Sequence, residues 1–286
     1  KWASNEGTRD VQTVSYMDRI MTYAEQNDMR FRQHNLIWGR NPQGGNNQQP
    51  NWADDMLQSP NAIDSVSGNI NSVALRDEIS ERIDYYIRDR AHRYYEVDIY
   101  NESYHTGSHQ NHSSNTYWDV YGPAGIASIY KESKDAVAAV GAEAKIFINE
   151  YKGATTLELV MRHYETLQNA GREAYGEDVV DGIGFQYYAS HLGGGAHSPA
   201  RIYSVMQNLA VHGLPMHLTE FGISSVTTNQ TTQANILSEA LRLVFGMPDT
   251  TGFTMWGFWA GSVWSGAPNG VLYNQDWTIR PTGPAW

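Results

Sequence analysis

The chain has 286 residues, of which 41% are hydrophobic and 18% charged, which suits a globular protein with room for one large barrel domain or two ordinary ones. Its formal net charge of −11 argues against nucleic acid and anionic membranes as partners, because both attract basic surfaces. With no cysteine, disulfide frameworks, thiolate zinc sites and a cysteine nucleophile are excluded. No apolar run approaches the length of a membrane span.

Apolar spacing along the chain predicts alternating helices and strands. The first helix is expected over residues 11–27, followed by a strand over 29–38 and a long polar loop to about residue 52. Further strands are expected over 96–102, 144–150, 180–187, 216–222 and 252–259, with helices over 71–90, 125–140, 157–175, 199–212 and 231–245. This repeat favours an α/β fold with a parallel sheet and right-handed crossovers.

Polar, glycine-rich or aromatic loops follow the predicted strands. This arrangement is typical of a (β/α)8 TIM barrel, whose chemistry lies at the carboxyl ends of its strands. Only six strands are apparent, whereas a closed barrel has eight. We therefore expect a single (β/α)8-type domain over residues 1–286 that lacks its first one or two βα units in this chain. A smaller or open barrel is the alternative.

Two of the predicted strands carry a glutamate at their carboxyl ends, Glu102 and Glu220. Glycoside hydrolysis needs such a pair: one acid protonates the leaving oxygen, and one carboxylate attacks the sugar or activates water. Taken singly, either glutamate is equally well explained as a surface or ion-paired residue. Glu150 ends another predicted strand, and we expect it to support the site or to form an ion pair.

Six short motifs occur in order along nearly the whole chain: Lys1-Trp2, His34 to Trp38, Asp98 to Glu102, Gly182 to Gln186, Leu218 to Glu220, and Trp256-Gly257 with Trp264. Together they resemble the glycoside hydrolase family 10 endo-β-1,4-xylanases. The resemblance implies hydrolysis with retention of configuration, with Glu102 as acid/base and Glu220 as nucleophile. It further implies a secreted protein whose signal peptide has been removed. We expect a monomer that acts on xylan or a related β-glycan without cofactor or metal.

The resemblance also implies which side chains contact the substrate: Lys1, Trp2, His34, Trp38, Asn101, Gln186, Tyr188, Trp256 and Trp264. Asn101 would bond the sugar 2-hydroxyl, and Gln186 would orient Glu220. Lys1 and His34 would donate to sugar hydroxyls, and the last two tryptophans would floor and cover the subsite at the cut bond. The plain alternatives are a satisfied core histidine for His34, a buried polar residue for Gln186 and ordinary core for the tryptophans.

Four positions depart from the family pattern. Gly39 and Tyr188 stand where histidine is usual, and Gly222 and Ala260 stand where aspartate is usual. Two of these changes touch the network that orients the nucleophile. They leave open a β-glycanase or exo-glycosidase of the same barrel type with a different sugar specificity. A non-catalytic barrel that binds polysaccharide or inhibits an enzyme is the alternative from another class.

Two further stretches were weighed as binding sites. His105, His109 and His112 share one loop, but no fixed carboxylate pattern accompanies them, so no metal site is expected. The run Gly193–Gly195 is not followed by Lys and Ser or Thr, as a phosphate loop would be. We expect it to form a mobile loop over the cleft instead.

Overall fold

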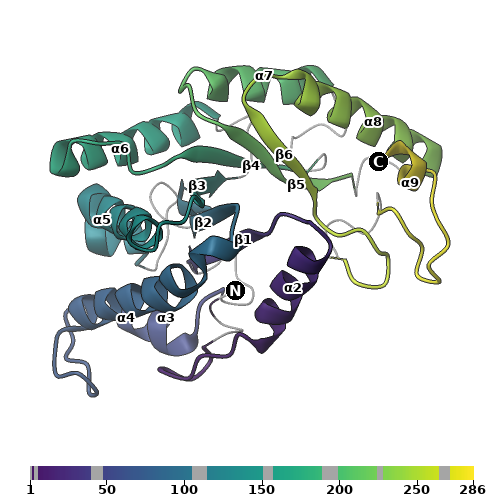
Figure 1. Cartoon of the computed structure of the whole chain (residues 1–286). Helices are drawn as coiled ribbons and strands as arrows, with labels where there is room; N and C mark the ends of the chain where they lie inside the picture. Colours follow the sequence, from purple (N-terminus) through teal and green to yellow (C-terminus); the bar gives the residue numbers. More distant parts are fainter. Residues whose placement is uncertain are drawn as a thin grey trace. The chain divides into compact units, whose positions relative to one another are not determined.

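A computed structural model describes residues 2, 6–39, 48–104, 115–150, 157–188, 199–223, 228–263 and 271–286. The chain divides into two compact units, Lys1–Asn149 with His163–Asp181 and Glu150–Arg162 with Gly182–Trp286. Within the described residues, six strands alternate with helices along the chain (Figure 1). The strand pairs within each unit are parallel, which confirms the predicted α/β class.

The first unit holds a parallel sheet in the order β1-β2-β3. Every residue of β2 is buried, as expected of a parallel strand with both faces covered. The elements are α2 (Ser15–Gln26), β1 (Arg32–Trp38), α3 (Asn51–Gln58), α4 (Asn71–Tyr86), the 3-10 helix η1 (Arg88–Arg93), β2 (Glu96–Asn101), α5 (Tyr117–Ala139) and β3 (Lys145–Glu150), whose last residue falls in the second unit.

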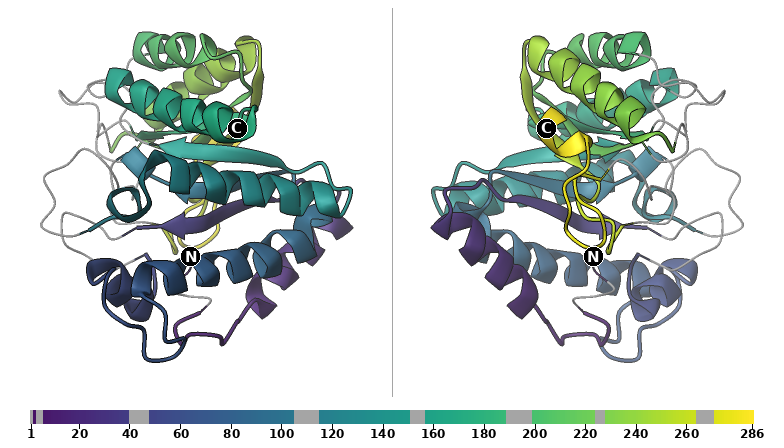
Figure 2. Two further views of the ribbon diagram at one scale, coloured as in Figure 1. Left: turned by 90° about the vertical axis from the view of Figure 1, so that its left-hand side faces the viewer. Right: turned by 90° about the vertical axis from the view of Figure 1, so that its right-hand side faces the viewer.

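The second unit holds a parallel sheet in the order β4-β5-β6. All residues of β4 and β5 are buried, while α7 and α8 run alongside one another on one side of these strands (Figures 1 and 2). The elements are β4 (Gly182–Tyr188), α7 (Pro199–Ala210), β5 (Met216–Gly222), α8 (Gln230–Gly246), β6 (Thr250–Met255) and α9 (Thr282–Ala285), and α6 (Leu157–Tyr175) begins in this unit and ends in the first.

Helix α5 begins earlier than its apolar spacing suggests. Thr116 caps it with a reciprocal pair of bonds: the Asp119 N–H donates to the Thr116 hydroxyl at 3.2 Å, and the Thr116 N–H donates to the Asp119 carboxylate at 2.9 Å. Gly122, with φ +63°, and Pro123 then interrupt the helical geometry. The prediction from residue 125 therefore found only the part beyond this kink.

Strand β1 begins three residues later than predicted. The Met29 N–H donates to the Ala24 carbonyl at 2.8 Å, so Met29 still closes the end of α2. Helix α3, which begins at the end of the predicted polar loop, and the short α9 were not expected from the sequence. Among the described residues, no helix combines the length and apolarity that a membrane span requires.

Candidate active site

Glu102 directly follows β2 in an unusual backbone conformation. Its φ is +56°, in the left-handed region that side chains with a Cβ rarely occupy. The Glu102 N–H donates to the Asn149 carbonyl at 2.7 Å, and the Trp38 indole N–H donates to the Glu102 carboxylate at 3.2 Å. The backbone turn and the indole thus fix where the partly exposed carboxyl group lies. Residues held in such conformations cluster at functional sites.

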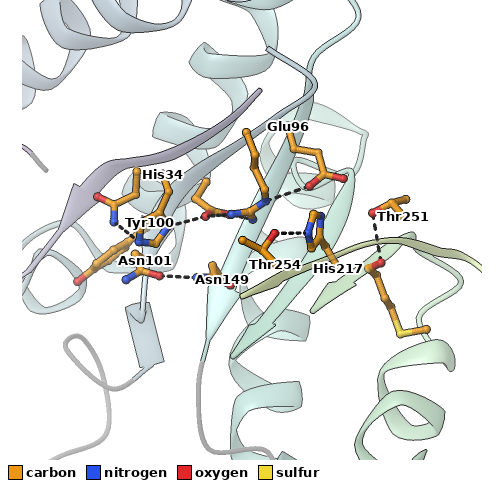
Figure 3. A network of polar contacts seen from close by, with 12 residues as sticks. His34, Glu96, Tyr100, Asn101, Asn149, His217, Thr251 and Thr254 are labelled. Carbon is orange, nitrogen blue, oxygen red and sulfur yellow. Dashed lines mark hydrogen bonds and ion pairs between the residues drawn. The ribbon is translucent and has the colours of Figure 1, made fainter. Parts of the chain in front are cut away.

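The residue before it, Asn101, is held by a second amide. The Asn149 side chain donates to the Asn101 side-chain oxygen at 2.7 Å, and the two residues are partners in the β2–β3 register (Figure 3). Both are fully buried. The bond fixes the rotation of the Asn101 amide, whose contact with a sugar 2-hydroxyl stays a prediction.

An ion-pair network joins the first halves of β1 and β2, the strands that lead to Trp38 and Glu102. Arg32 bonds Glu96 at 2.9 Å and also binds both carboxylate oxygens of Asp98, a residue with no exposed surface. The nitrogen Nδ1 of His34 lies 2.8 Å from Asp98 (Figure 3). Burial alone would raise the pKa of Asp98, but Arg32 and His34 outweigh it and lower that pKa.

His34 is neutral in this setting. Burial lowers the pKa of His34, and this outweighs the opposite effect of Asp98. A neutral ring whose Nδ1–H donates to Asp98 has its acceptor at Nε2, where the Asn35 amide lies at 3.3 Å. From the sequence we predicted that His34 donates to a sugar hydroxyl, whereas this assignment makes its Nε2 an acceptor. A sugar hydroxyl would therefore have to donate to Nε2 in place of the Asn35 amide.

Trp2 lies in the core of the first unit with no exposed surface. Its indole N–H donates to Glu6 at 2.9 Å, and the ring meets Trp52 edge-on at a centroid distance of 5.5 Å. The guanidinium of the buried Arg82 lies 5.1 Å from the same ring. These contacts explain Trp2 as a packing residue, and the substrate contact expected of it stays a prediction.

Glu220 lies within β5 of the second unit and is only 3% exposed. The Tyr188 hydroxyl donates to the Glu220 carboxylate at 2.5 Å. Gln186, which we expected to orient Glu220, is its partner in the β4–β5 register. The sequence pattern assigned Tyr188 only to substrate contact, although residues 186 and 188 of one strand must share a face. The two-residue spacing from Gln186 was the signal that Tyr188 could also reach Glu220.

The backbone of Trp256 is tied to the same strand. Its N–H donates to the carbonyl of Phe221, the residue after Glu220, at 3.0 Å. Gly257 follows with φ +97°, a conformation that favours glycine. Phe221 packs against Phe253 with ring centroids 4.9 Å apart. Trp256 is therefore held beside the nucleophile strand, while its contact with a sugar stays a prediction.

Other carboxylates lie near these strands. Glu150, at the end of β3, is 5% exposed, and its supporting role stays a prediction. In the described part of the chain, Glu6, Asp10 and Glu78 bring possible metal-ligand atoms within 4.8 Å of one another. Arg9 forms an ion pair with Glu78, and Glu6 accepts the bond from Trp2, so two of these three carboxylates have protein partners.

Several predicted positions lie outside the described residues: Lys1, Trp264, His105, His109, His112 and Gly193–Gly195. The predicted acid/base and nucleophile lie in different units, Glu102 in the first and Glu220 in the second. Each carboxylate accepts a hydrogen bond from an aromatic side chain of its own unit. Their separation stays a prediction of about 5–5.5 Å, the spacing that a retaining mechanism uses.

Two curated proteins are similar to nearly the whole of this chain. Endo-1,4-beta-xylanase B of Cellvibrio japonicus (strain Ueda107) is 24% identical over 98% of this chain and 39% of that protein. Anti-sigma-I factor RsgI6 of Acetivibrio thermocellus is 22% identical over 99% of this chain and 32% of that protein. The chain thus spans about a third to two-fifths of the length of these curated relatives.

The structure of xylanase B from Clostridium stercorarium F9 matches with a TM-score of 0.75 at 20% identity, over 99% of this chain and 86% of that chain. This likeness supports the barrel-type fold. The family description "Glycosyl hydrolase family 10" matches residues 1–284. The chain therefore belongs to glycosyl hydrolase family 10.

Proposed function

We propose that this chain is the catalytic part of a secreted endo-β-1,4-xylanase that retains anomeric configuration. The observation that carries the proposal is the paired setting of the two glutamates. Each stands at or near the carboxyl end of a buried parallel strand, and each carboxylate accepts a hydrogen bond from an aromatic side chain. Membership of the family and the xylanase names of its relatives support the same reaction.

In the proposed first step, ionised Glu220 attacks the anomeric carbon while protonated Glu102 gives its proton to the leaving oxygen. The bond from Tyr188 stabilises the ionised form of Glu220, because a hydrogen bond to a charged carboxylate favours that charge. In the second step, Glu102 takes a proton from water while the water oxygen attacks the anomeric carbon and the bond from that carbon to Glu220 breaks, which releases the sugar. The same side chain thus acts as acid and then as base.

Sugar recognition is proposed for the residues around these carboxylates. Asn101 and His34 would bond hydroxyls of the sugar next to the cut bond, and the flat faces of Trp38 and Trp256 would pack against pyranose C–H groups. The neutral state of His34 fits this role, because a neutral ring offers an acceptor that an imidazolium lacks. We expect no cofactor and a monomeric protein.

The deciding experiment is hydrolysis of arabinoxylan, β-glucan and an aryl xylobioside by wild type, Glu102→Gln and Glu220→Gln. Wild type should release xylo-oligosaccharides, with the β-anomer formed first by NMR. Both variants should lose polysaccharide turnover by several orders of magnitude. With the aryl substrate, Glu102→Gln should still show a burst of phenol, since a good leaving group needs no acid. Glu220→Gln should show none.

Glu143→Gln is the matched control, because Glu143 is exposed and precedes β3 at a distance from the proposed chemistry in sequence. It should turn over substrate like wild type. Equal polysaccharide turnover by wild type and Glu220→Gln would refute the proposed nucleophile. Release of glucose oligomers from β-glucan, with no product from arabinoxylan, would identify a β-glycanase instead of a xylanase.

Binding without turnover is the second candidate. The observation that favours it is the relative named as an anti-sigma-I factor, which matches 99% of this chain and does not carry the name of an enzyme. The departures at Tyr188 and Gly222, beside the proposed nucleophile, are consistent with it. Under this alternative the wild type would bind xylan in affinity electrophoresis and release no product over a prolonged incubation.

A further inference from the structure

Tyr188 and Gly222 lie opposite one another at the nucleophile end of the second unit. The register pairs Gln186 with Glu220, Tyr187 with Phe221 and Tyr188 with Gly222 without a shift. Alternation along each strand places Tyr188, Glu220 and Gly222 on one face. The stacked rings of Tyr187 and Phe221, 6.2 Å apart and inclined by 10°, occupy the other.

The Tyr188 side chain leans back along the strand toward Glu220. Its Cα faces Gly222, yet its hydroxyl lies 2.5 Å from the Glu220 carboxylate. Because position 222 pairs with position 188 on the neighbouring strand, a side chain there would stand beside Tyr188, and glycine has none. The two departures from the family pattern on these strands are therefore neighbours.

We propose that Tyr188 is a positioning residue that holds the Glu220 carboxylate through its hydroxyl, and that Gly222 provides the space for this arrangement. The proposal rests on the proposed role of Glu220 as nucleophile. Tyr188 and Glu220 are both buried, at 5% and 3% exposure. A bond of 2.5 Å is within the range of charge-assisted O–H···O⁻ bonds, which are about twice as strong as neutral ones.

A phenol differs from the histidine that the family resemblance leads one to expect here. The ordinary pKa of tyrosine is about 10 and that of histidine about 6.5. The tyrosine hydroxyl therefore remains a donor throughout the acid and neutral range, and it brings no positive charge to the carboxylate. The histidine would change its charge within the same range. The position thus determines how the activity depends on pH.

Tyr188→Phe tests the hydroxyl, and Tyr187→Phe is its matched control on the opposite face of the same strand. The acid limb of the kcat/KM profile on an aryl xylobioside reports ionisation of the nucleophile. In Tyr188→Phe this limb should move up by about one to two pH units, the shift expected from one hydrogen bond to a charged group. The loss should be largest at acid pH and shrink toward neutrality.

Tyr187→Phe should leave the acid limb where it is. If Tyr188 only filled space, Tyr188→Phe would lower activity by the same factor at every pH, and this result would overturn the proposal. The proton-donor role also predicts partial rescue by Tyr188→His, with an added inflection near pH 6.5. Tyr188→His with the wild-type profile would contradict the proposal too, even if Tyr188→Phe failed to fold.

A readout without turnover separates this inference from the proposed function. The carboxyl carbon of Glu220 can be followed by NMR in protein labelled at glutamate, with the signal assigned by its absence in Glu220→Gln. Its titration midpoint should rise in Tyr188→Phe and stay unchanged in Tyr187→Phe. A shifted midpoint in a protein without xylanase activity would support the hydrogen bond and refute the enzyme. Xylan turnover together with an unshifted midpoint would support the enzyme and refute the hydrogen bond.

Gly222→Asp tests the second half of the proposal in a double-mutant cycle with Tyr188→His. The aspartate should crowd Tyr188 and bring a like charge near Glu220, so kcat/KM should fall. In the Tyr188→His background the smaller ring leaves room and can bond the new carboxylate. The loss there should be smaller by about tenfold, within the range of coupling between touching residues. Equal losses in both backgrounds would refute the spatial pairing.

Discussion

The two glutamates of this protein lie in contrasting surroundings. Below Glu102, the first unit places ions in the sheet: Arg32 binds both Glu96 and Asp98, and Asp98 also bonds His34. At Glu220, the carboxylate accepts a bond from the neutral Tyr188 hydroxyl on one face of the strand, and the Phe221 ring lies on the other.

The contrast separates two ways of fixing a carboxylate. In the first unit, charge neutralisation between β1 and β2 stabilises the strand register, and Glu102 is placed by the backbone turn that follows and by the Trp38 indole. In the second unit, the Tyr188 phenol contacts the carboxylate itself. Buried ion pairs are costly to break, whereas a neutral donor can be removed with little change in charge balance. Substitutions in the first unit should therefore affect stability most, and Tyr188→Phe should affect the pH profile most.

Beyond the glutamate variants, the largest expected effect is that of Asp98→Asn. It leaves Arg32 beside an amide in a buried setting, and the free energy of unfolding should fall by about 3–5 kcal/mol. Asp84→Asn is the matched control, because the Asp84–Arg88 pair lies on the surface, at 53% and 44% exposure. The control should cost less than about 0.5 kcal/mol in urea denaturation. Similar losses in the two variants would refute the importance of burial.

His34 and Asp98 together predict that the free energy of unfolding falls in two stages as the pH is lowered. Burial holds the pKa of His34 below its ordinary value of about 6.5. The contribution of neutral His34 to folding stability is therefore present above that pH and is lost as the pH falls. Asp98, whose pKa is lowered by Arg32 and His34 against the effect of burial, contributes above about pH 4 and loses this contribution below it. Unfolding at pH 3–8 should reveal both stages. Asp98→Asn should lack the lower one.

A smaller effect is expected in the second unit at Gly252. A Cβ added there would lie 2.4 Å from the His217 ring, whose Nε2 bonds Thr254 at 2.9 Å (Figure 3). Gly252→Ala should therefore destabilise the protein by about 1–3 kcal/mol, as overpacking does. At Gly246 an added Cβ meets nothing within 4 Å, so Gly246→Ala should be neutral or slightly stabilising. A neutral Gly252→Ala would show that the ring moves freely.

The smallest effects are expected from one helix cap in each unit. Thr116 caps α5 and Asn229 caps α8, each accepting a bond from a backbone N–H in the first turn. Replacing either by alanine should cost about 1 kcal/mol. Because we expect the chain to behave as one domain, both variants should shift the same single unfolding transition. Two transitions, each moved by only one variant, would contradict the single-domain prediction.

The spacing of apolar residues predicted much of the fold. Helix α6 was predicted with its observed bounds, because its apolar spacing is regular and uninterrupted. Helix α3 was missed because its sequence follows a stretch rich in Gly, Asn, Gln and Pro. Its buried residues Ala53, Met56 and Leu57 do show helical spacing, but over only two turns. Such a short signal is outweighed by polar neighbours until tertiary packing is known.

The candidate site also has a part that the sequence predicted and a part that it did not. Motif order placed Glu102 and Glu220 near strand ends, because that information lies in consecutive residues. The bonds from Trp38 to Glu102 and from Tyr188 to Glu220 join residues 64 and 32 positions apart. Such pairs depend on strand register, which a single sequence specifies only indirectly. Arg32 was missed for the same reason, since nothing in its own segment indicates the acidic partners on β2.

The left-handed backbone at Glu102 has a consequence for the history and engineering of this chain. A side chain with a Cβ is held there at a cost of order 1–3 kcal/mol, which glycine would avoid and asparagine would reduce. Variants selected for thermal resistance alone should therefore drift toward Gly or Asn at position 102 and lose the carboxyl group. Stability alone therefore does not explain a glutamate at position 102, whereas the proposed chemistry of its side chain does.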